Sequence, residues 1–233
     1  HLYQLIEPYL EKALATNPKF SLVDHGAGKS YLGFILYDLF LKDKGGTLYA
    51  IEHRPELIEK AKALADNLKF DRMHFFASDI KNSLEDSSIP NKVDIVTALH
   101  ACDTATDDAI LFGLKKEAQY IVLIPCCQAE VAKTLRSEKS DQLKYTLSEL
   151  WRHPIHTREF GSHLTNVLRC LLLEGMGYKV TVTELVGWEH SMKNELIMAE
   201  NIHQPKKIAL DRLEEILKTC HLESLKSRFL PTI

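Results

Sequence analysis

The sequence predicts an α/β fold with a mostly parallel sheet and helices on both faces of that sheet. Short apolar runs typical of buried strands alternate with longer segments whose apolar residues recur at helical spacing. This alternation indicates parallel strands joined by right-handed crossovers. The chain has 233 residues, 45% of them hydrophobic, which is enough to bury one sizeable core.

The first half of the chain alternates most clearly. A helical stripe over Leu2–Ala15 ends at the Asn17-Pro18 pair, which breaks a helix. In order, the next predicted elements are a strand at Phe20–Asp24, a helix at Tyr31–Leu41, a strand at Thr47–Ile51, a helix at Leu57–Leu68 with Pro55 near its first turn, and a strand at Met73–Ala77.

The second half predicts the rest of the sheet. Strands are expected at Val93–Leu99 and Tyr120–Pro125, a helix between them at about Thr104–Leu114, a later helix at Ser162–Met176 that stops at Gly177, a closing strand pair at Val180–Val186 and Leu196–Ala199, and a last amphipathic helix at Lys206–Cys220. We expect a single domain over 1–233, with an N-terminal helix in 1–17 and a C-terminal helical tail in 203–233.

Composition narrows the class of protein. Lys and Arg number 29 against 32 Asp and Glu, so global charge gives no argument for nucleic acid or anionic membrane, although a local basic patch is compatible with it. Apolar runs such as Val167–Met176 are too short and too charged to span a bilayer. We expect no signal peptide in the sequence that begins at His1, and five cysteines do not suggest a disulfide framework. We therefore expect a cytoplasmic protein that does not enter a membrane.

A glycine loop, Asp24–Ser30, follows the first strand at the sheet edge where ligands bind in such folds. A phosphate-binding P-loop would need glycine where Val23 stands. The dinucleotide fingerprint would need glycine where the bulky Tyr31 stands, which disfavours a dehydrogenase. A third pattern, acidic-x-G-x-G, is matched by Asp24, Gly26 and Gly28. The open alternative is that a strand-to-helix turn needs these glycines for steric reasons alone.

Two further carboxylates follow the next two strands. Glu52 comes 28 residues after Asp24, about one strand-helix-strand unit, where a carboxylate can accept bonds from both ribose hydroxyls. Asp79 follows the third strand and could accept from an adenine amino group. Each has an alternative role, Glu52 as a helix-capping or solvated acid and Asp79 as an N-cap or turn residue. Together the three acids mark the strand ends that an adenosine would lie across.

With these features in place, the chain resembles class I S-adenosylmethionine (SAM)-dependent methyltransferases. It is more similar to a bacterial branch that is related to the domain of a eukaryotic tRNA 2′-O-methyltransferase and to some ribosomal-RNA-methylase-like proteins. The resemblance rests on Val23–Lys29 (VDHGAGK), Leu99–Asp107 (LHACDTATD), Pro125–Cys127 (PCC), Leu168–Glu174 (LRCLLLE) and Glu189–Asn194 (EHSMKN), of which the second is the most specific.

The resemblance implies a Rossmann-like, seven-stranded sheet and SAM as the methyl donor. The expected cofactor-binding residues are Asp24, Gly26, Ala27 and Gly28 near the methionine moiety, Glu52 at the ribose, Asp79 and Ile80 at the adenine, and Leu99 at the end of the fourth strand. Ser30 departs from the family, because many relatives carry a third glycine there, and this leaves the loop conformation open.

Residues after the strands that end at Leu99 and Pro125 should meet beside the transferred methyl group. His100 is the first candidate for a base, since its ordinary pKa lies near working pH; the alternative is a contact with the cofactor or a helix cap. Asp103 is a second candidate, and it is also expected to cap the helix that begins near Thr104. Lys193, in a turn between the last predicted strands, is another candidate that could face the site. The alternative is an ordinary exposed turn lysine.

The cysteines leave several possibilities. Cys126 or Cys127 could act as a covalent nucleophile, although the recognised nucleophile contexts are not matched closely. His100, Cys102 and the Cys126-Cys127 pair offer zinc ligands, but the adjacent pair lacks the usual spacing, so no metal is predicted. Apolar packing is the most common role of buried cysteines. A polar cluster, His153, His156, Arg158 and His163, could line an acceptor entrance.

The sequence thus predicts a SAM-dependent methyltransferase whose acceptor it does not identify. RNA, either tRNA or rRNA, is suggested by the relatives, and a protein or small molecule suits the mildly acidic composition equally well. A non-catalytic scaffold of the same fold is the alternative from another class, and the joint presence of the glycine loop, Glu52 and Asp79 argues against it.

Overall fold

The fold was determined from a computed structural model of the chain. It describes residues 1–99, 101, 103–126, 128–137, 149–150, 152–185 and 195–232. None of the helices within these ranges is long and apolar enough to cross a membrane.

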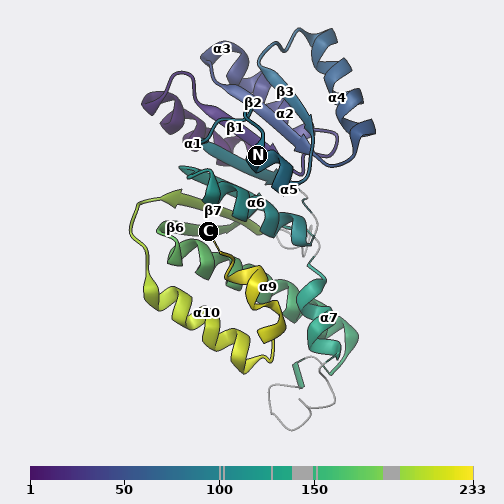
Figure 1. Cartoon of the computed structure of the whole chain (residues 1–233), viewed down its shortest axis with the longest axis vertical. Coiled ribbons are helices and arrows are strands. Elements are labelled where there is room, and N and C mark those ends of the chain that lie inside the picture. The colour runs from purple at the N-terminus through teal and green to yellow at the C-terminus, as the bar shows by residue number, and fades with distance from the viewer. Residues whose placement is uncertain are drawn as a thin grey trace.

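The centre of the molecule is a seven-stranded sheet with the order β3-β2-β1-β4-β5-β7-β6 (Figure 1). The strands are β1 (Ser21–His25), β2 (Thr47–Glu52), β3 (Met73–Ala77), β4 (Ile95–Leu99), β5 (Tyr120–Ile124), β6 (Tyr178–Glu184) and β7 (Glu195–Asn201). Strands β1 to β5 pair in parallel, whereas β7 runs antiparallel to both β5 and β6. The strand order reverses between β1 and β4, which is the position where such sheets bind ligands.

Helices cover both faces of the sheet, as Figure 1 shows. They are α1 (Leu2–Thr16), α2 (Tyr31–Leu36), α3 (Lys42–Lys44), α4 (Pro55–Leu68), α5 (Ile80–Glu85), α6 (Thr104–Lys115), α7 (Glu130–Ser137), α9 (Pro154–Gly175), α10 (Lys207–Thr219) and α11 (Lys226–Phe229), with a π-helical stretch η1 (Tyr37–Leu41) between α2 and α3 and a 3₁₀ turn η3 (Glu223–Leu225). The predicted fold class, a mostly parallel sheet of seven strands between helices, is confirmed.

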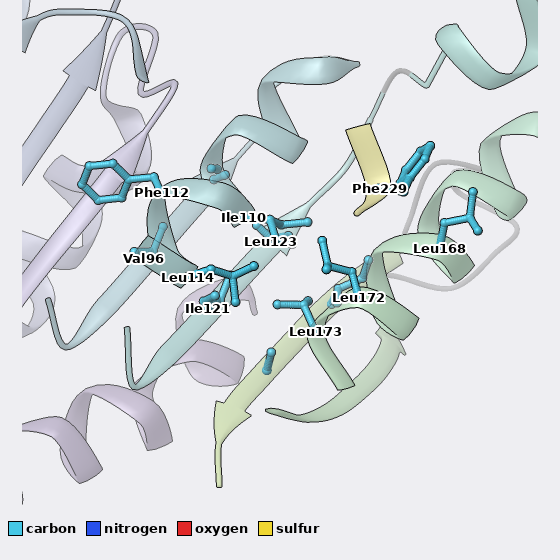
Figure 2. Packing of buried hydrophobic residues seen from close by; sticks show 14 of the residues in the cluster. Val96, Ile110, Phe112, Leu114, Ile121, Leu123, Leu168, Leu172, Leu173 and Phe229 are labelled. Atoms are coloured by element: carbon cyan, nitrogen blue, oxygen red, sulfur yellow. The ribbon is translucent and has the colours of Figure 1, made fainter. Parts of the chain in front are cut away.

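Two apolar clusters fill the two sides of the sheet, because successive strand side chains point to opposite faces. Leu22 packs in the cluster under α1 and α2, and its neighbour Val23 packs in the cluster under α6, α9 and α10. Figure 2 shows the second cluster, where Val96 and Phe112 lie on one side and Leu172 lies on the other. By the same alternation, the side chains of Asp24 and His25, the next two residues of β1, point to opposite faces of the sheet.

The elements predicted from periodicity agree with the structure in type and order. Three differences concern helices that the pattern did not reveal. Helix α9 begins at Pro154 instead of Ser162, and α5 and α7 were not predicted. The first turns of α9 bury Thr157 and Gly161 and carry few large apolar residues, while α7 buries only Val131, Ala132 and Leu135. The first turns of α9 therefore give little periodic signal, and α7, with 8 residues, is shorter than the window of about 11 to 18 residues in which helical periodicity is recognised.

Candidate active site

The glycine loop leaves β1 through a series of left-handed backbone conformations. Gly26 has φ +69°, Gly28 has φ +58° and Ser30 has φ +57°. A Cβ at Gly26 would also lie 3.3 Å from the Cβ of Ala101. Glycine is therefore required here by the backbone, and Ser30 adopts the conformation that would favour the glycine found in relatives.

A cavity of about 230 Å³ opens above this loop. Its lining residues are Asp24, Gly26, Ala27, Gly28, Lys29, Tyr31, Leu32, Arg54 and Leu99. Five of the residues expected to bind the cofactor thus share one space at the switch point of the sheet. The close approach of bare backbone at Gly26 and Gly28 is what a ligand held against main-chain groups requires.

Asp24 is the buried acid of this cavity, with 1% of its surface exposed. Burial raises the pKa of its carboxyl from 3.8 to about 7, even though the Thr97 hydroxyl and the Gly33 N–H both favour the charged form. The Thr97 hydroxyl donates to Oδ1 at 2.9 Å. Near neutral pH the carboxyl is therefore only partly ionised, and a cationic ligand group beside it would favour the ionised form.

His25, the next residue, points to the other face of the sheet. Its ring lies 5.3 Å from that of Phe112 on α6, and neither ring nitrogen has a hydrogen-bond partner among the described residues. Burial lowers the pKa of the imidazole to about 4, although the charge of Glu52 opposes the shift. His25 is therefore neutral at physiological pH.

Glu52 ends β2 and is held by the loop and by its own neighbours. Its Oε2 accepts the Gly28 N–H at 2.8 Å. Its Oε1 accepts both the backbone N–H and the Nε of Arg54, at 3.1 and 2.8 Å, and lies 2.9 Å from Nδ1 of His53. Burial alone would raise the pKa of Glu52, but these hydrogen bonds from Arg54 and Gly28 outweigh it and lower the pKa below its usual value.

Arg54 is a site residue that the sequence reasoning missed. Its guanidinium lines the cavity and contacts both carboxylate oxygens of Glu52, with Nη2 3.3 Å from Oε2. The side chain stays half exposed. The only sequence signal was a cation two residues after the acid at the strand end. The expected ribose-binding carboxylate is therefore already paired within the protein.

Asp79 and Ile80 lie one strand further along, after β3. The Asp79 Oδ1 accepts the N–H of Asn82 at 2.9 Å, so the capping role proposed as an alternative for Asp79 is confirmed. Ile80 is partly buried against the apolar cluster under α6. The Ser78 N–H donates to the Glu52 carbonyl at 3.1 Å, which ties this loop to the end of β2.

On the acceptor side, His100, Cys102, Cys127 and Lys193 lie outside the described residues. Three of the four zinc ligands considered above are in this group. Cys126 is described and is half-buried directly beyond β5. Because β4 and β5 pair in parallel, the segment that contains Cys126 leaves the sheet next to the segment after β4, which contains Ala101 and Asp103.

Asp103 does not cap the helix that it precedes, which corrects the expectation from the sequence. It sits at the N-terminal end of α6 with φ +52°, but makes no side-chain bond to that helix. Its Oδ1 instead accepts the N–H groups of Ala129, at 2.9 Å, and Glu130, at 3.1 Å. The loop after β4 thereby caps α7, the helix that follows β5.

A buried arginine from α9 completes this tie, and the sequence reasoning gave it no role. Arg169 is 1% exposed and binds Asp107 with two parallel bonds of 2.7 and 2.9 Å. Its Nη2 also donates to the Asp103 carbonyl at 2.8 Å, and its Nη1 to Oδ1 of Asn166 at 3.2 Å. A charged residue within the apolar run Val167–Met176 was the available signal, because such a residue needs a buried partner.

Comparison with known proteins places the chain among methyltransferases. Residues 1–134, more than half of the chain, match the family model described as a methyltransferase domain. The glutathione S-transferase C-terminal domain-containing proteins of Homo sapiens and Macaca fascicularis are 28% identical over 199 residues, which cover 78% of this chain and 30% of each relative. The chain thus spans about 30% of the length of these curated relatives.

Solved structures share the fold. An rRNA methylase from Streptococcus thermophilus is 12% identical with a TM-score of 0.52, covering 84% of this chain and 94% of its own. A putative methyltransferase from Streptococcus mutans, in complex with SAH, is 11% identical with a TM-score of 0.52, covering 85% and 97%. The predictions of an enzyme of the methyltransferase class and of SAM as its cofactor are confirmed. The chain belongs to the methyltransferase-domain family.

Proposed function

We propose that this methyltransferase binds SAM across the carboxyl ends of β1, β2 and β3 and transfers its methyl group to RNA. The observation that carries the cofactor site is the cavity at the switch point, where the buried Asp24 and the bare backbone of Gly26 and Gly28 meet. Glu52 binds this loop through the Gly28 N–H and brings a second carboxylate to it.

Different residues of the site are proposed to bind different parts of SAM. Asp24 and the glycine loop would hold the amino-acid end, Glu52 the ribose hydroxyls, and Asp79 with Ile80 the adenine. Leu99 closes the cavity from the β4 side. When bound, SAM supplies an electrophilic methyl group on a sulfonium. The protein contributes position, because the strand ends fix these groups relative to each other.

The acceptor is proposed to approach the loops after β4 and β5. We propose His100 as the base that takes the acceptor proton, and Cys126 and Lys193 as neighbours of the reacting group. The Asp103 carboxylate accepts the N–H groups of Ala129, just before α7, and of Glu130, its first residue, which supports a positioning role for this carboxylate. An rRNA methylase shares this fold, which supports RNA as the acceptor. The alternatives are a protein or small-molecule acceptor and a non-catalytic scaffold.

Calorimetric titration of the purified chain with SAM and S-adenosylhomocysteine tests the cofactor site, with NADH and ATP as controls. Binding of the SAM pair alone is expected. Absence of SAM binding would favour a scaffold, and binding of NADH or ATP would contradict the interpretation of the glycine loop. If SAM binds, methyl transfer to tRNA and rRNA is measured next.

We propose a cytoplasmic location for this enzyme. Cys170 and Cys220 are free thiols. Burial raises the pKa of the Cys170 thiol to about 12, so this thiol stays protonated and unreactive. Free thiols are the usual state of cysteine in a reducing compartment.

The pairing of Arg54 with Glu52 predicts a competition with the cofactor. Arg54→Gln should raise SAM affinity by up to about fivefold, because an ion pair whose arginine is half exposed contributes about 1 kcal/mol and the ribose hydroxyls need the same carboxylate oxygens of the buried Glu52. Titration calorimetry at low and high salt measures the effect, which should shrink as salt screens the pair. Lys60→Gln, on the exposed face of α4, removes the same charge as a control. A lower affinity in Arg54→Gln would show that Arg54 binds the cofactor itself.

The Asp79 carboxylate can be tested without losing its cap. Asp79→Ser retains an oxygen that can accept the Asn82 N–H, while it removes the acid expected at the adenine. SAM affinity should fall roughly tenfold, as for the loss of one hydrogen bond to a charged group. The melting temperature should stay close to that of the wild type. Equal SAM affinity in the two proteins would remove Asp79 from the cofactor site.

A further inference from the structure

A basic groove lies between α7 and α9, next to the acceptor side of the sheet. It encloses about 670 Å³ and is lined by Gln128, Ala129, Ala132, Lys133, Arg136, Pro154, Ile155 and Arg158. Three of these residues are cations and none is a carboxylate. In Figure 1, α7 and α9 lie side by side at the end of the molecule that is remote from α4.

The groove is built on a close helix contact. Gly161 of α9 faces Ala132 of α7 so tightly that a Cβ at position 161 would come within 2.8 Å of it. At the inner end, Gln128 is buried and held from both sides of its amide: it accepts the Ser162 hydroxyl at 2.7 Å and donates to Asn166 at 3.1 Å. The two walls are therefore fixed relative to each other.

The cations are distributed along both walls. Lys133 and Arg136 are three residues apart on α7, so they lie on one helix face about 4.5 Å apart along its axis. Both are exposed, and neither forms an ion pair with a carboxylate among the described residues. Arg158 faces them from α9, where its Nε also contacts Glu159 at 2.9 Å. This local excess contrasts with the net charge of −3 of the whole chain.

The position of the groove connects it to the chemistry. Its inner end, Gln128, is four residues beyond Ile124, the last residue of β5, and Ala129 at the same end donates to Asp103 of the β4 loop. A molecule lying in the groove is thus led towards the carboxyl ends of β4 and β5. Ile155, 57% exposed, adds an apolar surface at the rim on which a base could rest.

We propose that this groove binds the phosphate groups of a single nucleic-acid strand and guides that strand to the methyl-transfer site. The proposal rests on the proposed function, since it assigns the acceptor of the same reaction. Cations spread over two walls suit a chain of phosphates better than one compact anion. Binding through phosphates predicts little sequence preference and a strong dependence on salt.

The test compares two triple variants of the full chain. Lys133→Gln with Arg136→Gln and Arg158→Gln neutralises the groove, whereas Lys19→Gln with Lys60→Gln and Lys62→Gln removes three exposed charges elsewhere. Both lower the net charge from −3 to −6, so long-range electrostatics are matched. Fluorescence anisotropy with a labelled 20-nucleotide single-stranded RNA, and with a mononucleotide as competitor, is measured over a range of salt concentrations. SAM affinity is measured in parallel on each protein.

The groove variant should bind the strand at least about tenfold more weakly than the control variant, and the slope of log affinity against log salt should fall by about 2. SAM affinity should be equal in the three proteins. Equal strand affinity in the two variants, or no strand binding by the wild type, would overturn the groove proposal, while SAM binding would leave the proposed cofactor site standing. A mononucleotide that competes as well as the strand itself would also overturn it, because the groove would then bind a small phosphorylated molecule.

Discussion

Asp24→Asn should weaken SAM binding by about 30-fold or more at pH 7.5. Asparagine keeps the shape and the bond from Thr97 but cannot supply the negative charge that a buried ammonium group needs as a partner. The loss of a hydrogen bond between charged groups is worth about 2 to 3 kcal/mol, which corresponds to this change in affinity. Titration calorimetry measures it. Asp43→Asn, an exposed acid outside the cavity, is the matched control and should bind as the wild type does.

The same residue predicts how the affinity depends on pH. The pKa of Asp24 is raised to about 7 by burial, so below pH 7 cofactor binding must first remove a proton, and the affinity should fall about tenfold per pH unit. Above about pH 8 an α-amino group loses its own charge, so the affinity should be highest between about pH 7 and 8. Asp24→Asn should show no decline below pH 7. A decline of wild-type size in that variant would assign it to another group.

Stability should change in the opposite direction from binding. A folded-state pKa above the unfolded value means that the Asp24 contribution to stability is fully present below about pH 4 and is lost as the pH rises through about 7. Asp24→Asn carries no such buried charge. The difference in melting temperature between Asp24→Asn and the wild type should therefore shift in favour of the variant as the pH rises from about 4 to about 7. Asp24 would then be an active-site residue that lowers stability.

Arg169→Met should lower the free energy of unfolding by about 3 to 5 kcal/mol, the largest stability effect we expect in this chain. Methionine fills the space of the arginine stem but leaves the Asp107 carboxylate, 8% exposed, without its partner. It also removes the donor to the Asp103 carbonyl. Urea unfolding followed by circular dichroism measures the change.

A double variant separates the buried charge from the connection between loops. Arg169→Met with Asp107→Leu should recover most of the stability, because no unpaired charge remains. Amide hydrogen exchange should still be faster at Ala129 and Glu130, whose N–H groups bind the loop that Arg169 supports. Wild-type exchange at both amides would mean that Asp103 holds α7 without help from Arg169.

The fold and the cofactor edge followed from local sequence patterns. Short, mostly apolar runs indicate where each strand stops, and in a parallel sheet the residues at the ends of β1, β2 and β3 must meet at one edge. Asp24, Glu52 and Asp79 could therefore be assigned to that edge from their positions alone. The glycine spacing added the loop, since Gly26 and Gly28 hold conformations that other residues adopt with difficulty.

Partners of polar side chains could not be predicted in this way. Asp103 binds amides 26 and 27 residues away, and Arg169 binds an acid 62 residues away, so both pairings exist only once the sheet has brought distant loops together. The capping preference of aspartate predicted the type of bond that Asp103 makes but assigned it to the nearer helix. Arg54 was missed for a related reason, since its place in the cavity depends on how the chain turns after β2.

The antiparallel strand β7 also covers an edge of β5 that would otherwise be unpaired. All five residues of β5 are buried, and β7 takes up the hydrogen-bonding groups along its outer side. Without β7, an apolar strand with open main-chain groups would be exposed to other chains, which is a common route to aggregation. The region that matches the family ends at residue 134, yet the sheet is complete only with strands contributed after it. A chain shortened to residues 1–134 would keep the proposed SAM site but lack β6 and β7, and we would therefore expect it to self-associate.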